Sequence, residues 1–131
     1  MRLLTRQRQS ALILLCLAGA LAIPTSLESQ SRRIIRITAE RFSFTPSQVT
    51  IAPGEEVELR LKSDDTSHGF RITGTDVNVA IPKRGRKELS VMFRPMQPGR
   101  YAFECTRMCG AGHNFMRGVL IVRDPGDRTG S

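Results

Sequence analysis

The chain of 131 residues has no tryptophan, a single tyrosine, three cysteines and two histidines. It also lacks internal repeats, low-complexity segments and acidic runs, so its composition indicates one ordinary globular domain. After residue 23, no stretch of ten or more residues shows the 3.6-residue period of an amphipathic helix, which argues against an α-helical fold. We find no carboxylate dyad, no paired nucleophile and base, and no nucleic-acid recognition motif. The domain by itself is therefore not expected to be an enzyme or to bind nucleic acid.

The N-terminal residues have the pattern of an export signal. The first ten residues contain three arginines and no acid, and a 13-residue apolar run from Ala11 to Ile23 ends at Pro24. A helix of that length spans about 20 Å, less than the hydrocarbon core of about 30 Å. Together with the small residues of Ala20-Leu-Ala22, this predicts a signal peptide over residues 1–23; an uncleaved signal anchor helix is the alternative. We therefore expect an exported protein, in the periplasm or on the periplasmic face of the cytoplasmic membrane, which contacts membrane only through an uncleaved segment.

The remainder divides into three parts. Residues 24–33 are polar and contain proline, as expected of a linker; residues 34–123 form the predicted domain, and residues 124–131 a frayed tail. The net charge is +8, and the first ten residues carry three of these charges, which leaves a mild +5 elsewhere. Four of the remaining cations are close together at Lys83, Arg84, Arg86 and Lys87. They either attract an acidic redox partner or form an ordinary solvated loop.

Short strands account for most of the predicted domain. Over residues 56–62 apolar and charged side chains alternate strictly, so that Val57, Leu59 and Leu61 share one face. Residues 88–94 and 100–105 alternate in the same way and place six side chains inward: Leu89, Val91, Phe93, Tyr101, Phe103 and Cys105. Less regular strand candidates are residues 34–39, 49–51, 68–73, 77–81 and 118–123, and glycine and proline separate them. Seven or eight short strands predict an all-β Greek-key sandwich or barrel.

Candidate metal ligands are concentrated in residues 105–116, Cys-Thr-Arg-Met-Cys-Gly-Ala-Gly-His-Asn-Phe-Met. Two thiols, an imidazole and a thioether occur here within twelve residues, at Cys105, Cys109, His113 and Met116. The second histidine of the chain, His68, begins another predicted strand, and a Greek-key connection would bring it to the same end of the domain. Glycines between the ligands allow the loop to turn its side chains toward a common point.

The same residues are compatible with a helical face, a disulfide or a zinc site. The spacing of Cys105, Cys109 and His113 would suit one face of a helix, although two intervening glycines disfavour that by about 1 kcal/mol each. In an oxidising compartment the two thiols could form a disulfide. Zinc would accept two thiolates and two imidazoles but has no use for Met116. Either histidine could also be an ordinary core or surface residue.

Ligand chemistry favours copper. Thiolate and thioether ligands select copper over harder ions, and imidazole suits it as well. Two histidines, one cysteine and a weak methionine are the ligands of a mononuclear blue-copper site, which His68, Cys109, His113 and Met116 would supply. The additional thiol of Cys105 changes the expectation, because two thiolates can bridge two copper ions.

The motif Cys-x3-Cys-x3-His-x2-Met, with His-Gly-Phe upstream, resembles the binuclear copper A domain of cytochrome c oxidase subunit II, which also occurs in nitrous oxide reductase. The resemblance extends over about residues 42–122 and implies a cupredoxin fold. It implies that Cys105 and Cys109 bridge two copper ions and that His68 and His113 each bind one. Met116 and the backbone carbonyl of Arg107 would be weak ligands; at position 107 the family usually has glutamate.

Two departures concern the partner rather than the copper. Oxidase subunit II usually has two membrane helices, whereas this chain has one short apolar segment at most. The family often uses an exposed tryptophan cluster to receive electrons from cytochrome c, and this chain contains no tryptophan. The expected function is one-electron transfer between redox proteins, such as a c-type cytochrome, another small carrier, or a terminal oxidase of which the chain would be a subunit. A periplasmic copper carrier or a mononuclear blue-copper protein are the alternatives.

Overall fold

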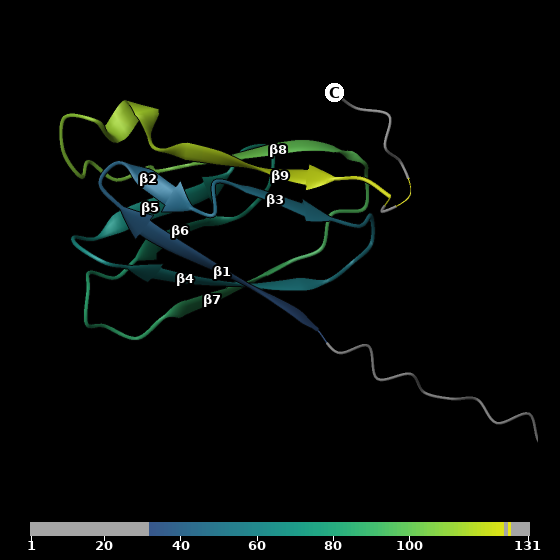
Figure 1. The fold of residues 1–131 in the computed structure, drawn as a ribbon, viewed down its shortest axis with the longest axis horizontal. Helices are drawn as coiled ribbons and strands as arrows, with labels where there is room; N and C mark the ends of the chain where they lie inside the picture. Colours follow the sequence, from purple (N-terminus) through teal and green to yellow (C-terminus); the bar gives the residue numbers. More distant parts are fainter. Residues whose placement is uncertain (1–31, 125, 127–131) are drawn as a thin grey trace, which may run out of the picture.

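The computed structural model describes residues 32–124 and residue 126, which form two packed β-sheets (Figure 1). The predicted signal peptide or anchor helix, most of the predicted linker and most of the tail lie outside these residues. The described part contains nine strands and one short 3-10 helix: β1 Arg33–Glu40, β2 Ser43–Thr45, β3 Gln48–Ile51, β4 Val57–Ser63, β5 His68–Ile72, β6 Asn78–Ile81, β7 Leu89–Phe93, β8 Gly99–Glu104, η1 His113–Phe115 and β9 Arg117–Val122. Within this part, no helix is long and apolar enough to cross a membrane.

The chain passes repeatedly between the two sheets. One sheet has the strand order β2-β1-β4-β7 and the other the order β3-β9-β8-β5-β6. Strands β1 and β4 pair in parallel, as do β3 and β9, whereas β5 is antiparallel to both β6 and β8. Because β8 and β5 run in opposite directions, with Glu104 opposite Arg71, the residues that follow β8 continue alongside the start of β5. This pairing brings the candidate ligands of the two strands to one end of the sandwich.

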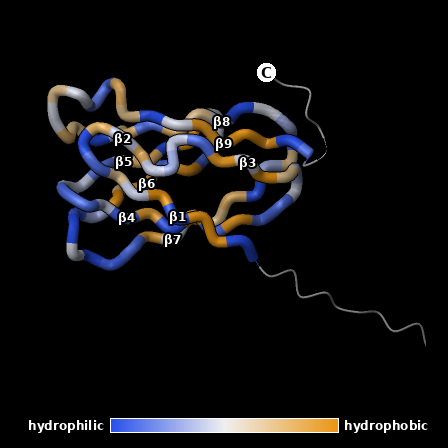
Figure 2. Tube along the Cα trace, viewed as in Figure 1, coloured by the Kyte–Doolittle hydropathy of each residue, from blue (hydrophilic) through white to orange (hydrophobic). Residues whose placement is uncertain are grey.

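The core lies between the sheets and follows the predicted alternation. Val57, Leu59 and Leu61 of β4 are fully buried, as expected for a strand with neighbours on both sides. Leu89 and Val91 are only half-buried, because β7 is an edge strand of its sheet. Figure 2 shows the same pattern as apolar segments along the strands and polar segments in most of the connections.

The sandwich confirms the predicted all-β fold, and each expected strand is present with shifts of one residue or so at its ends. The sequence pattern does not predict strand β2, because three residues are too few to show alternation. This strand inserts Phe44 into the core, where the ring packs edge-on against Phe70 and Phe103 with centroids 5.7 and 5.3 Å away. The short helix η1 is likewise absent from the prediction.

Candidate metal centre

The upstream histidine and the first cysteine meet at one end of the sandwich. His68 is the first residue of β5, and Cys105 directly follows β8, the strand with which β5 pairs. The backbone N–H of Gly69 donates a hydrogen bond to Cys105 Sγ at 3.4 Å. Residues 37 positions apart in the sequence are therefore brought into contact by strand pairing.

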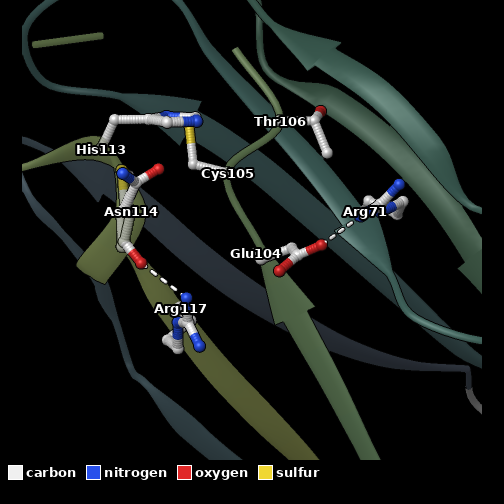
Figure 3. A pocket seen from close by; sticks show the side chains of 8 residues that line it. Arg71, Glu104, Cys105, Thr106, His113, Asn114 and Arg117 are labelled. Carbon is white, nitrogen blue, oxygen red and sulfur yellow. Dashed lines mark hydrogen bonds and ion pairs between the residues drawn. The ribbon is translucent and has the colours of Figure 1, made fainter. Parts of the chain in front are cut away.

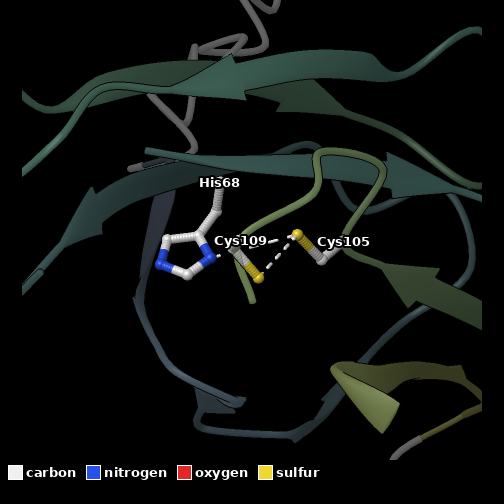
Figure 4. Close-up of side chains that lie close together, drawn as sticks. All are labelled: His68, Cys105 and Cys109. Atoms are coloured by element: carbon white, nitrogen blue, oxygen red, sulfur yellow. Dashed lines mark hydrogen bonds between the residues drawn. The ribbon is translucent and has the colours of Figure 1, made fainter. Parts of the chain in front are cut away.

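The two sulfurs each face one imidazole. Cys105 Sγ lies 3.9 Å from His68 Nδ1 and 3.9 Å from Cys109 Sγ, and Figure 4 shows these three side chains converging. Cys109 Sγ in turn lies 3.9 Å from His113 Nδ1. The ligand atoms of His68, Cys105 and Cys109 are all within 4.8 Å of one another.

The two predicted weak ligands lie at the same place. The sulfur of Met116 is 3.9 Å from Cys109 Sγ, and the carbonyl oxygen of Arg107 is 3.2 Å from Cys105 Sγ. The structure thus gathers the five residues that the sequence pattern singled out and Arg107, which the family resemblance added. His68, Cys105, Cys109 and Met116 are buried, whereas His113 is half-buried beside the solvent.

Neither a disulfide nor a helical face describes this arrangement. Both thiols are free, and their sulfurs are much farther apart than the roughly 2.05 Å of a disulfide bond. Residues 105–112 form a loop, and among the candidate ligands only His113 lies in a helix, the single turn η1. The ligands therefore converge through loop geometry and strand pairing.

Asp65 fixes the orientation of His68. Its Oδ1 lies 2.7 Å from His68 Nε2. That ring nitrogen therefore carries a proton and donates a hydrogen bond to the carboxylate, which leaves Nδ1 free to face Cys105. Burial of Asp65 favours a raised pKa, but hydrogen bonds from His68 and from the backbone amides of Arg41 and Thr66 outweigh it and lower the pKa to about 2. The carboxylate therefore stays charged at neutral pH.

At the Cys109 thiol, burial is the largest effect on the pKa. It raises the pKa of Cys109 to about 11, and a hydrogen bond and charge interaction with Cys105 contribute in the same direction. A metal ion that binds here must therefore displace a firmly held proton.

The turn between β1 and β2, which belongs to the other sheet, contacts the site. Arg41 Nε donates a hydrogen bond to the carbonyl oxygen of Cys109 at 2.7 Å, and the Arg41 backbone N–H donates to Asp65 Oδ2 at 3.1 Å. The Phe42 ring occupies the space beside two loop glycines, since a Cβ on Gly110 or Gly112 would lie 2.9 or 2.4 Å from it. This turn therefore contacts both halves of the site.

A polar pocket of about 310 Å³ opens beside the site. Figure 3 shows Cys105 and His113 on one side and the ion pair of Arg71 and Glu104 on another. Cys105 reaches the pocket wall although it is almost fully buried. The ligand cluster thus lies just beneath the surface.

The donor set is suitable for copper. Soft sulfur and imidazole donors line the centre, and the adjacent carboxylate of Asp65 contacts the far nitrogen of His68 rather than the sulfurs. Metal–sulfur and metal–nitrogen bonds of roughly 2.3 and 2.0 Å allow donors up to about 4.3 Å apart to share one ion. Each sulfur–nitrogen pair, at 3.9 Å, meets that condition without rearrangement.

Comparison with known proteins agrees with this chemistry. The family model described as "Cupredoxin-like domain" matches residues 11–122. The chain belongs to this family. A curated relative, cytochrome c oxidase subunit 2 of Thermus thermophilus, is 29% identical over 90 residues, which cover 69% of this chain and 65% of that protein. A nitrous-oxide reductase of Ralstonia nicotianae is 33% identical over 92 residues, covering 67% of this chain and 14% of that enzyme.

Solved structures show the same cupredoxin-like sandwich. A heme-copper terminal oxidase dimer contains a chain with a TM-score of 0.60 and 27% identity, over 74% of this chain and 69% of that one. The periplasmic domain of cytochrome oxidase subunit II from Bradyrhizobium japonicum has a TM-score of 0.64 at 15% identity, over 71% and 85%, which concerns the fold alone. This chain spans 65% and 52% of the first two curated relatives. The family and the histidine–cysteine cluster together support copper binding.

The sequence pattern missed the residues that surround the ligands. Asp65, three residues before His68, carried a weak signal, because a carboxylate is a common partner of a metal-binding histidine. Arg41 and Phe42 carried none. They lie more than 60 residues before the loop that they contact.

Proposed function

We propose that this cupredoxin-like domain is a one-electron relay with a binuclear copper centre of the copper A type. The observation that carries the proposal is the paired arrangement of the donors. His68 faces Cys105, His113 faces Cys109, and the two sulfurs lie side by side at 3.9 Å. One imidazole for each sulfur favours two ions that share the thiolates over a single ion.

In this proposal the thiolates of Cys105 and Cys109 and the imidazoles of His68 and His113 would hold the copper pair. Met116 and the carbonyl of Arg107 are the weak ligands. When bound, the copper pair supplies reversible one-electron oxidation and reduction. The protein contributes a nearly constant geometry, because His68, Cys105 and Met116 are buried and lie in or next to strands β5, β8 and β9. A fixed geometry lowers the reorganisation that accompanies electron transfer.

The wider setting is also proposed. The curated relatives are named as subunits of cytochrome c oxidase or as nitrous-oxide reductase. We infer an exported protein that exchanges electrons with a c-type cytochrome, with another small carrier, or with a terminal oxidase in which it is a subunit. The domain itself performs no chemistry on a substrate.

Metal content and optical spectra test the proposal. Purified chain loaded with copper is expected to bind two ions and to show a delocalised mixed-valence signal in electron paramagnetic resonance. Cys105→Ser should abolish that signal and reduce the copper content. In chain that retains residues 1–23, Cys16→Ser alters the third cysteine, is the matched thiol control and should change neither.

Two different results would assign a different function. One copper with an intense blue thiolate band, unchanged in Cys105→Ser, would identify a mononuclear electron carrier. Copper held only as Cu(I), with no signal after oxidation, would identify a copper carrier.

A further inference from the structure

Apolar side chains are exposed on the loop that holds the ligands. Met108 and Phe115 are 79% and 81% exposed, the two highest values among the exposed large hydrophobic residues of the described part. Each directly precedes a candidate ligand, and those ligands, Cys109 and Met116, have their sulfurs 3.9 Å apart. Phe42, which packs beside the loop glycines, is 38% exposed as well. We call Phe42, Met108 and Phe115 the apolar patch.

Several cations are exposed at this end of the sandwich. Ile81 pairs with His68, so the connection between β6 and β7 starts beside the site, and the Arg84 backbone N–H donates to the Asp65 carbonyl. Figure 1 shows this connection and η1 at the same end, and Figure 2 shows the connection as strongly hydrophilic. Six exposed cations at this end have no ion pair within residues 32–124: Lys83, Arg84, Arg86, Lys87, Arg107 and Arg117.

Most acids at the same end are neutralised. Asp64 pairs with Lys62, Asp65 with Arg41, and Glu104 with Arg71. Among the described residues, only Glu40 and Glu88 remain there as exposed acids outside an ion pair. Six free cations against two free acids give this end of the sandwich a positive potential.

We propose that this end of the domain is a docking surface for an acidic redox protein. Apolar side chains of the partner contact Met108 and Phe115, and its carboxylates face the exposed cations. The inference rests on the proposed electron relay and names the partner class. Exposed apolar residues rimmed by charge are typical of interaction sites, and opposite charge mainly increases the association rate. Docking here places the partner directly over the buried sulfurs, which shortens the distance for electron transfer.

Binding can be measured with two probes of opposite charge. The full chain, copper-loaded and in parallel metal-free, is titrated with an acidic c-type cytochrome and with a basic one at low salt. We expect the acidic cytochrome to bind at least about tenfold more tightly, and its association rate to fall about tenfold or more in high salt. Amide chemical shifts of the chain should change around residues 108 and 115.

Matched variants separate the apolar and the charged contributions. Met108→Ser or Phe115→Ser should weaken binding about fivefold or more. Met96→Ser, the same change at another exposed methionine but at the opposite end, should have no effect. Arg86→Glu should lower the association rate and its salt dependence. Arg100→Glu, the same charge change at the start of β8 and so at the far end, should lower it much less.

Three results would overturn the inference: equal or tighter binding of the basic cytochrome, equal effects of the control variants, or binding of this face to anionic lipid vesicles but not to the acidic cytochrome. Because binding of the cytochrome is also measured with metal-free chain, the test of the docking surface is independent of the test of the copper centre. Two bound coppers with no acidic partner would contradict only the docking surface. Docking with a single blue copper would contradict only the binuclear centre.

Discussion

At the scale of single residues, the contact between Asp65 and His68 links the site to stability. The pKa of Asp65 is lowered to about 2 from 3.8, so the contribution of this carboxylate is present above about pH 4 and is lost as the pH falls toward 2. A shift of this size corresponds to about 2 kcal/mol.

Asp65→Asn should remove that dependence. In metal-free protein, the free energy of unfolding of the unaltered chain should fall by up to about 2 kcal/mol more than that of Asp65→Asn between pH 5 and pH 2, as measured by urea titration. Asp64→Asn is the control, because Asp64 forms only an exposed pair with Lys62. Parallel pH curves for the unaltered chain and Asp65→Asn would contradict the assignment.

At the scale of elements, the close approach of β5 to the turn after β8 requires glycine at position 69. A Cβ there would lie 2.2 Å from Thr106 Oγ1 and 2.6 Å from the Thr106 backbone nitrogen. The same approach allows Gly69 N–H to donate to Cys105. Strand β5 and the turn after β8 can therefore approach this closely only if residue 69 has no side chain.

Gly69→Ala should destabilise the fold by about 1–3 kcal/mol and weaken copper binding, because β5 and the turn must separate. Adding Thr106→Ala should recover only part of the loss, since the backbone nitrogen remains in the way. Thr106→Ala alone, at an exposed position, should cost less than about 0.5 kcal/mol in urea unfolding. Complete recovery in the double variant would show that the hydroxyl alone limits the approach.

The turn between β1 and β2 is the second element on which the site depends. Arg41→Ala removes the hydrogen bond to the Cys109 carbonyl and should lower copper affinity about tenfold, measured by competition with a chelator. Amides of residues 109–113 should also exchange faster with solvent. Arg41→Lys should restore part of the affinity, and Arg71→Ala, which breaks a surface ion pair with Glu104, should leave the exchange of these amides unchanged.

At the scale of the whole molecule, metal binding and folding are coupled, because the ligands come from distant parts of the chain. Free metal at about 1,000 times its dissociation constant adds about 4 kcal/mol to the free energy of unfolding. The high pKa of Cys109 sets the pH dependence of the copper affinity. Below about pH 11 this thiol holds a proton that copper must displace, so affinity should rise about tenfold per pH unit for each such proton.

Thermal unfolding between about pH 6 and pH 8 should therefore show a copper-dependent rise in the melting temperature that grows with pH. Cys109→Ser should remove most of it. In metal-free protein the sign is opposite, because a raised thiol pKa contributes stability below about pH 9 that is lost as the pH rises through about 11. A copper effect that does not vary with pH would contradict the displacement of the thiol proton.

The amino-acid sequence by itself determined the strand class and the candidate ligands. Alternation in residues 57–61 specifies a buried face, because successive side chains of a strand point to opposite sides, and four ligands fall within one twelve-residue segment, where local spacing suffices. Only the tertiary structure decided that β7 is an edge strand, that three residues around Phe44 form β2, and that Asp65 and Arg41 support the ligands. Apart from Asp65, which is three residues before His68 and carried a weak local signal, these features arise from contacts between distant residues, and such contacts leave no periodic or local trace in the sequence.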